Sequence, residues 1–183
     1  GTSTVVHFKK RIVWLIILAI IELFSGMIIN HYQPLLQQIY VLALFMPMLT
    51  AMGGNAGSQS ATVIVRALAL GQVNIKEWFK IIWKELRIAI LLAIILGLLT
   101  FINALILNST RTIPEGFSIS YISFVIALSM AMQVISSTFI GAFFPLLVKA
   151  FKGDPALAAS PAIATLVDIT GLLVYFSIAS LLL

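Results

Sequence analysis

The side chain best placed to do chemistry in this sequence is the carboxylate of Asp168, which lies inside an apolar run that continues to Leu183. The run opens with Asp154 and Pro155, residue types that favour the N-cap and the first turn of a helix. Asp168 follows after about 13 residues, or about 20 Å at ~1.5 Å per residue, which predicts a position near the middle of a membrane. An ionisable side chain at that depth costs on the order of 3 kcal/mol or more and usually has a function.

The neighbours of Asp168 predict the wall of a polar path. Ser160 and Ala164 precede it at four-residue intervals, so the three residues share one helix face. Pro161 has no N–H to donate, which frees the carbonyl of Leu157 in the same region. The alternative is that Asp168 is protonated and hydrogen-bonded between helices.

Glu22 is a second acid near the centre of an apolar run. It must face a partner helix or an aqueous cavity, because exposure to lipid is too costly. Two interpretations remain open, that Glu22 lines the pore and that it is a protonated contact between helices.

The stretch from Gly53 to Ser60, GGNAGSQS, combines small residues with amides and hydroxyls. Gly53 and Gly57 have the spacing at which helices approach closely, and Pro47 frees the carbonyl of Ala43 one turn earlier. Close packing explains the glycines but not the polar side chains around them, which indicate a helix surface that lines a water-filled path. These polar residues are Thr50, Asn55, Ser58, Gln59 and Ser60.

The composition predicts an all-α membrane protein. Of 183 residues, 61% are hydrophobic and 9% are charged, which is too apolar for a soluble domain. Five transmembrane helices are predicted, over residues 12–30, 35–70, 88–107, 119–148 and 156–183, in a single pore domain over residues 1–183. The second and fourth exceed the ~20 residues that a span needs, so they must tilt, break or project.

The basic residues predict the orientation of the chain in the cytoplasmic membrane. Of eleven Lys and Arg residues, all but Arg66 and Arg111 precede the first span or lie between spans two and three or four and five, and Arg66 lies close to the end of span two on this same side. The positive-inside rule then places the N-terminus in the cytoplasm and the C-terminus outside. The net charge of +5 therefore reflects topology and does not imply nucleic acid.

Residues 74–87 are amphipathic and are predicted to form an interfacial helix that does not span the membrane. Lys76, Lys80 and Lys84 recur every four residues, and Trp78 and Trp83 are suitable interface anchors.

Several other functions are excluded by residues that the sequence lacks. It contains no cysteine, and His7 and His31 lie at the ends of spans, which argues against soft-metal sites and a serine-protease base. An intramembrane aspartyl protease would need a second acid resembling Asp168, and GGNAGSQS lacks the lysine of a phosphate-binding loop. An adaptor would scatter polar side chains over all its spans, whereas here they concentrate in two. No enzymatic activity is therefore expected.

Two motifs together resemble the transmembrane domain of the MgtE magnesium channels, and the resemblance covers the whole chain. The first is Pro47 with Gly54-Asn55-Ala56-Gly57-Ser58-Gln59, and the second is Asp154-Pro155 with Ser160-Pro161, Asp168 and Gly171. The resemblance implies a homodimer whose pore is lined by spans two and five. It implies that Asp168 holds Mg²⁺ with help from the carbonyl of Ala164, and that metal binding at Asp154, at the cytoplasmic mouth, favours closure.

The expected function is passive conduction of Mg²⁺, which dehydrates reluctantly and is usually held by one or two carboxylates and waters. The alternative is a proton- or sodium-coupled divalent-cation transporter, with Glu22 or Asp168 as the carrier. The cytosolic N-terminal and CBS domains usual in the family have no counterpart in this sequence, so a separate cytosolic protein is expected to supply regulation. Ser160 departs from the Asn often found at its position. The pore-lining candidates are Gly54, Asn55, Gly57, Ser58, Gln59, Ser160 and Thr165.

Overall fold

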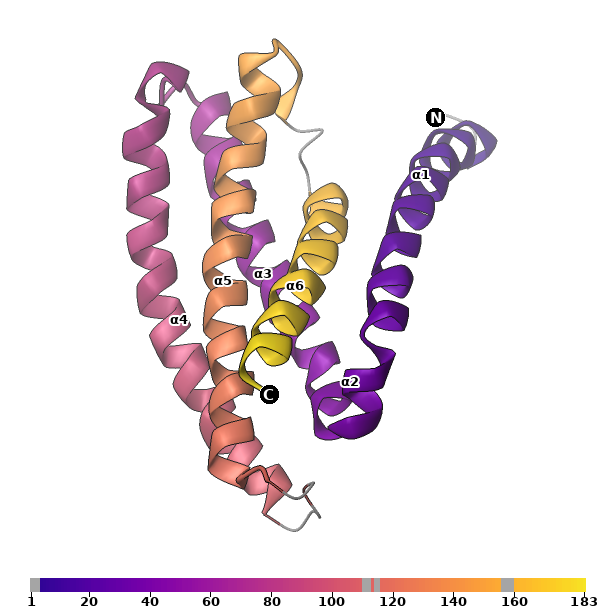
Figure 1. Ribbon diagram of the computed structural model, residues 1–183. Helices are drawn as coiled ribbons and strands as arrows, with labels where there is room; N and C mark the ends of the chain where they lie inside the picture. The colour runs from indigo at the N-terminus through magenta and orange to yellow at the C-terminus, as the bar shows by residue number, and fades with distance from the viewer. Residues whose placement is uncertain (1–3, 110–112, 114–115, 156–159) are drawn as a thin grey trace.

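The structure is a computed structural model that describes residues 4–109, 113, 116–155 and 160–183, and its elements are all helices (Figure 1). Five helices of the described residues are long and apolar enough to cross a membrane, which confirms the predicted class and number of spans. The chain is therefore a multi-pass membrane protein. The elements are α1 (Thr4–His31), α2 (Gln33–Gln38), α3 (Val41–Ala69), the 3₁₀ turn η1 (Ile75–Glu77), α4 (Trp78–Asn108), α5 (Ile119–Ala150) and α6 (Ser160–Leu182).

The predicted span over residues 35–70 is two helices rather than one. The short helix α2 carries Pro34 in its first turn and ends at Ile39, whose φ of −125° and ψ of 73° are not helical. Ile39 is fully buried and belongs to the main hydrophobic core. Burial of this side chain accompanies the break, and α3 then starts in a new direction.

The prediction of a separate interfacial helix over residues 74–87 is wrong. Only η1 is distinct, and α4 runs without a break from Trp78 to Asn108. No Gly or Pro interrupts the first 19 residues of α4, because Gly97 is the first of either type. The buried positions of the amphipathic part, Ile82 and Glu85, continue along the same face at Ala89 and Ala93. One amphipathic pattern therefore leads directly into the span.

Helix α5 is the centre of the bundle, because α3, α4 and α6 all pack against it (Figure 1). Its buried side chains extend over nearly its whole length, from Ile122 to Leu146. Helix α1 differs, since it packs mainly against α6 and leaves most of its surface exposed. The core is therefore a four-helix unit with α1 attached to one side.

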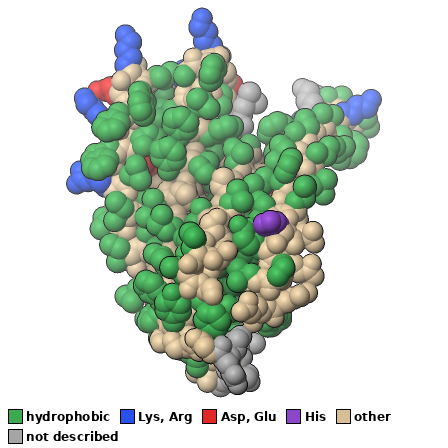
Figure 2. All heavy atoms as spheres, viewed as in Figure 1, with side chains coloured by type: hydrophobic (Ala, Val, Ile, Leu, Met, Phe, Trp, Pro, Cys, Tyr) green, Lys and Arg blue, Asp and Glu red, His purple; other side chains and the backbone are tan. Residues whose placement is uncertain are grey.

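The basic residues gather at one end of the molecule. The N-terminal end of α1, the α3–α4 connection and the α5–α6 connection share this end in Figure 1, and the Lys and Arg side chains visible in Figure 2 lie there. The structure thus has the charge asymmetry on which the predicted orientation depends. Which end faces the cytoplasm stays a prediction, to be checked by labelling single cysteines at Gln72 and Ser109 from each side.

The described part of α6 begins at Ser160, later than the predicted start at Asp154. Residues 156–159, including Leu157, lie outside the described residues, and so does the predicted release of the Leu157 carbonyl. Pro161 is the second residue of α6, where its missing N–H costs nothing. Asp168 follows Ser160 by about 12 Å at ~1.5 Å per residue, closer to the described helix start than the sequence indicated.

Candidate ion-binding site

The structure brings together the two acids predicted to lie inside the membrane. Asp168 on α6 and Glu22 on α1 are both half-buried, and their carboxylates interact electrostatically. Helices α1 and α6 pack against each other, and Tyr32, just after the end of α1, stacks on Phe176 of α6 with ring centroids 4.8 Å apart, about two helical turns beyond Asp168. Among the described residues, no group of three or more acids, histidines or cysteines that could hold a metal is formed.

Two carboxylates without further protein ligands suit a cation that keeps most of its water. Mg²⁺ demands octahedral oxygen coordination and is commonly bound by one or two carboxylates, with waters filling the rest. Like charges held close together disfavour ionisation of both groups, so a bound cation or a shared proton would relieve the repulsion. The geometry is therefore compatible with both the channel and the proton-coupled interpretation.

The other predicted site residues of α6 lie along the helix before Asp168. Ala164 is half-buried one turn earlier, and Thr165 donates its hydroxyl to the carbonyl of Pro161 at 3.1 Å. That donation leaves the Thr165 oxygen able to accept a hydrogen bond from a water. Asp154 is exposed in the α5–α6 connection, more than two helical turns before Asp168, and the side chain of Ser160 lies outside the described residues.

Helix α3 carries an outward polar stripe, which we define as Asn55, Gln59 and Thr62. All three side chains are exposed, and the Thr62 hydroxyl donates to the carbonyl of Ser58 at 2.8 Å. The buried face of α3 lies on the opposite side and includes Gly57 and Ile64. The stripe is exposed, and its member Gln59 also borders a cavity that α4 and α5 line.

Gly57 lies at the crossing of α3, α5 and α6. A Cβ at Gly57 would stand 3.0 Å from the carbonyl oxygen of Ser137 and 3.0 Å from Val167, and a Cβ at Gly141 would overlap the Gly57 backbone. The predicted close approach is confirmed at Gly57, which is buried by it. At Gly54, a pore-lining candidate, nothing of this chain lies within 4 Å of an added Cβ. Because Val167 precedes Asp168, the crossing also positions the acid.

A buried amide on α5 connects the two polar motifs. Gln133 is fully buried and donates from Nε2 to the carbonyl oxygen of Val167 at 3.2 Å. A Cβ at Gly53 or at Gly171 would overlap this amide, so the two glycines make room for it. Gln133 thereby holds the backbone next to Asp168, a positioning role that depends on the packing of α5 against α6.

Sequence reasoning missed Glu85, which is buried in α4 and accepts a hydrogen bond from the Ser60 hydroxyl at 2.8 Å. The spacing of the apolar residues around Glu85 could have indicated that this acid is buried. Ile82, Glu85 and Ala89 follow at helical intervals, so an acid stands in the middle of the buried stripe. Neighbouring Lys84 and Arg87 made the segment resemble an interfacial face.

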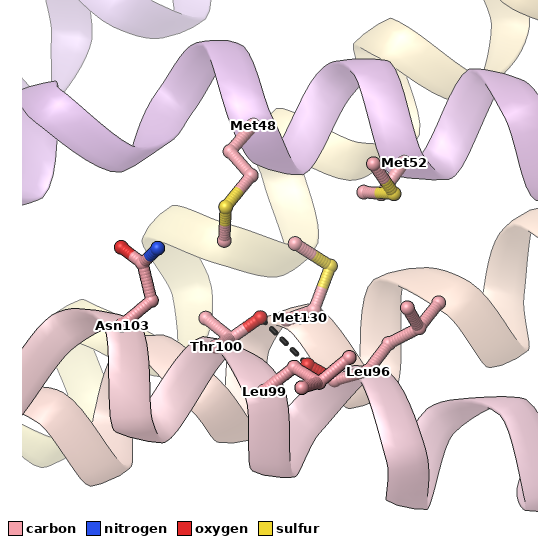
Figure 3. Close-up of a pocket in the computed structure, with 7 residues that line it drawn as sticks. All are labelled: Met48, Met52, Leu96, Leu99, Thr100, Asn103 and Met130. Atoms are coloured by element: carbon pink, nitrogen blue, oxygen red, sulfur yellow. Dashed lines mark hydrogen bonds between the residues drawn. The ribbon is translucent and has the colours of Figure 1, made fainter.

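A separate cavity of about 160 Å³ between α3 and α4 does not suit an ion (Figure 3). The side chains of Met48, Met52 and Met130 point into it. The Thr100 hydroxyl donates a hydrogen bond to the carbonyl oxygen of Leu96 at 2.7 Å, so it is not free to donate into the cavity. Thioethers are soft and weak ligands, whereas Mg²⁺ prefers oxygen. The cavity is therefore a gap in packing; its lining residues are Met48, Met52, Leu96, Leu99, Thr100, Asn103 and Met130.

The comparisons with known proteins agree with these features. Residues 46–178 match the model of the MgtE family, described as a divalent cation transporter. The chain is 36% identical over 98% of its length to the magnesium transporter MgtE of Bacillus subtilis, and 34% identical over 94% of its length to that of Thermus thermophilus. It spans 38% and 36% of the length of these two relatives. The chain belongs to the MgtE family.

Proposed function

We propose that this chain is the membrane-spanning pore of a divalent-cation transporter and that it conducts Mg²⁺ passively. The observation that carries the proposal is that Asp168 on α6 and Glu22 on α1, two helices that pack against each other, lie near enough for their charges to interact. Acids inside membrane spans are costly and are retained where they serve an ion path. The relatives named magnesium transporters support Mg²⁺ as the transported ion.

Mg²⁺ is held at Asp168 with most of its water. The carboxylate supplies the charge, and the carbonyl of Ala164 and the hydroxyl of Thr165 accept hydrogen bonds from bound waters. Conduction requires binding that is favourable enough for entry and weak enough for release, and contact through water meets both needs. Asp154, at the end of the bundle that carries the basic residues, is the proposed mouth of the path, where metal binding favours closure.

The pore forms between two copies of the chain. The outward polar stripe of α3 is exposed in one copy, and side-chain amides in hydrocarbon cost several kcal/mol when they lack partners. A second copy removes that cost by enclosing the stripe, together with Gly54 and Ser58, around water. The mass of the protein in nanodiscs should then equal two chains, and a single chain would contradict the dimer.

A coupled transporter is the second candidate, and the acid pair is the observation that favours it. Two neighbouring carboxylates can share a proton, so Glu22 could load a proton that Asp168 exchanges for Mg²⁺. The two candidates differ in what drives the ion.

Flux into proteoliposomes distinguishes them. The protein is reconstituted with a Mg²⁺-sensitive dye inside, and Mg²⁺ is added outside under a fixed membrane voltage. A passive pore should give the same initial flux with a pH gradient, with a Na⁺ gradient and with neither. Flux that requires one of these gradients would establish the coupled transporter instead, and liposomes without flux under all three conditions would contradict both.

A further inference from the structure

We propose that this chain holds a second divalent-cation site, separate from Asp168, in which Glu85 binds a largely hydrated ion between α3 and α4. Glu85 lies two turns into α4, which begins after the α3–α4 connection at the end of the bundle that carries the basic residues (Figure 1). The inference does not depend on conduction through Asp168. It assigns a ligand to an acid that the proposed pore does not use.

The burial of Glu85 is the first observation. Its side chain is only 8% exposed, and acids are rarely so buried without a partner. In the described part of the chain it accepts one hydrogen bond, from Ser60, and the one ion pair there joins Lys80 to Glu77 instead. A carboxylate offers about four acceptor positions, so a single neutral hydroxyl leaves most of them unused. Such a group is stabilised by a cation.

The second observation is the cavity that Glu85 lines. It has a volume of about 230 Å³ between α3, α4 and α5, and Gln59, Ser60 and Thr138 also line it. A water molecule occupies about 30 Å³ of liquid, so the space is sufficient for an ion with roughly six waters. The site therefore has room for a hydration shell, which a site for a bare ion would not need.

The donor set selects a hard cation. The side-chain oxygens around the cavity belong to a carboxylate, an amide and two hydroxyls, without a histidine or cysteine among the lining residues. The Thr138 hydroxyl donates its hydrogen to the carbonyl of Val134 at 2.8 Å, so its oxygen can only accept further hydrogen bonds or contact a cation. Oxygen ligands with waters suit Mg²⁺ and Mn²⁺ rather than softer metals. Lys84 also lines the cavity, but its side chain is exposed and can extend its ammonium into water.

A cation at Glu85 would act on the helix that carries the polar stripe. Helices α3 and α4 both pack on α5, and they are joined to each other by the bond from Ser60 to Glu85 and by the apolar contacts of Ile64 and Ile82. Ser60 follows Gly57 by one turn, and Gly57 touches α6 at Val167. Occupancy at Glu85 would therefore hold α3 in place relative to α6 and make the pore responsive to cation at this end.

The test counts Mn²⁺ bound to the full chain in nanodiscs by electron paramagnetic resonance, in an Asp154→Asn/Asp168→Asn background that removes both metal sites proposed for the pore. One Mn²⁺ per chain should remain in this background. Adding Glu85→Gln should weaken this binding at least tenfold, whereas adding Glu77→Gln, which removes an exposed acid nearby, should leave it unchanged. Mg²⁺ should displace the bound Mn²⁺, and Na⁺ at the same concentration should not.

Several outcomes would overturn the site: no Mn²⁺ on the folded Asp154→Asn/Asp168→Asn chain, unchanged binding after Glu85→Gln, or displacement by Na⁺ as effective as by Mg²⁺. If Glu85→Gln does not fold, the Ser60→Ala variant is tested in its place. It removes one of the oxygens that line the site, so Mn²⁺ should raise its melting temperature less than that of the unmodified chain, and an equal rise contradicts the proposal. Mn²⁺ bound at Glu85 in a chain without Mg²⁺ flux would refute only the pore.

Discussion

Asp168→Asn is expected to lower Mg²⁺ flux into proteoliposomes about a hundredfold while the protein still folds and assembles. The substitution keeps the size and hydrogen-bonding capacity of the side chain and removes the charge that offsets dehydration of the ion. A loss of ~3 kcal/mol corresponds to about two factors of ten, since each 1.4 kcal/mol is about tenfold. Initial flux at a fixed voltage, with thermal melting and particle mass on the same samples, measures the effect.

Glu22→Gln is the matched variant and should lower flux by about tenfold or less. Glu22 faces Asp168 but stands on α1, which has no polar stripe of its own. Because the two acids interact, the double variant should lose less than the product of the two single losses, as expected for neighbouring groups. Normal flux in Asp168→Asn with no flux in Glu22→Gln would place the ion path along α1 and refute the site.

Gly141→Ala is expected to destabilise the bundle by about 1–3 kcal/mol, the usual cost of overpacking a filled core. The added Cβ would stand 2.8 Å from the carbonyl carbon of Gly57, so backbone rather than a flexible side chain must give way. Separation of α3 from α5 should also move Val167 and Asp168 and reduce flux. Melting temperature in nanodiscs and flux in proteoliposomes are the two measurements.

The control for Gly141→Ala is Gly26→Ala, because nothing in this chain lies within 4 Å of a Cβ at Gly26. Alanine is the better helix former, by about 1 kcal/mol in a helix interior, so this variant should melt at the same temperature or slightly higher. Equal melting of the two variants would mean that the α3–α5 crossing is looser than described, and the positioning argument for Asp168 would fail.

The number of spans and the charge asymmetry were readable from the sequence, because both depend on residues near one another along the chain. Hydropathy over about 20 residues identifies a span wherever the chain folds, and a lysine in a connection stays in that connection. Boundaries were less accurate. Pro34 and Ile39 divide the predicted second span, and Trp78 begins a helix that joins two predicted elements.

Only the tertiary structure decided which faces meet. Gly54 and Gly57 look alike in the sequence, but a helix turns about 100° per residue, so Gly57 faces α5 and α6 while Gly54 does not. Glu22 and Asp168 were each assigned to the membrane, yet their meeting depends on how α1 leans on α6. The burial of Glu85 could not be read from its basic neighbours in the sequence, because its hydrogen-bond partner, Ser60, is 25 residues away on another helix. The sequence shows which side chains each helix carries on each face, and packing against other helices determines which of these side chains are brought together.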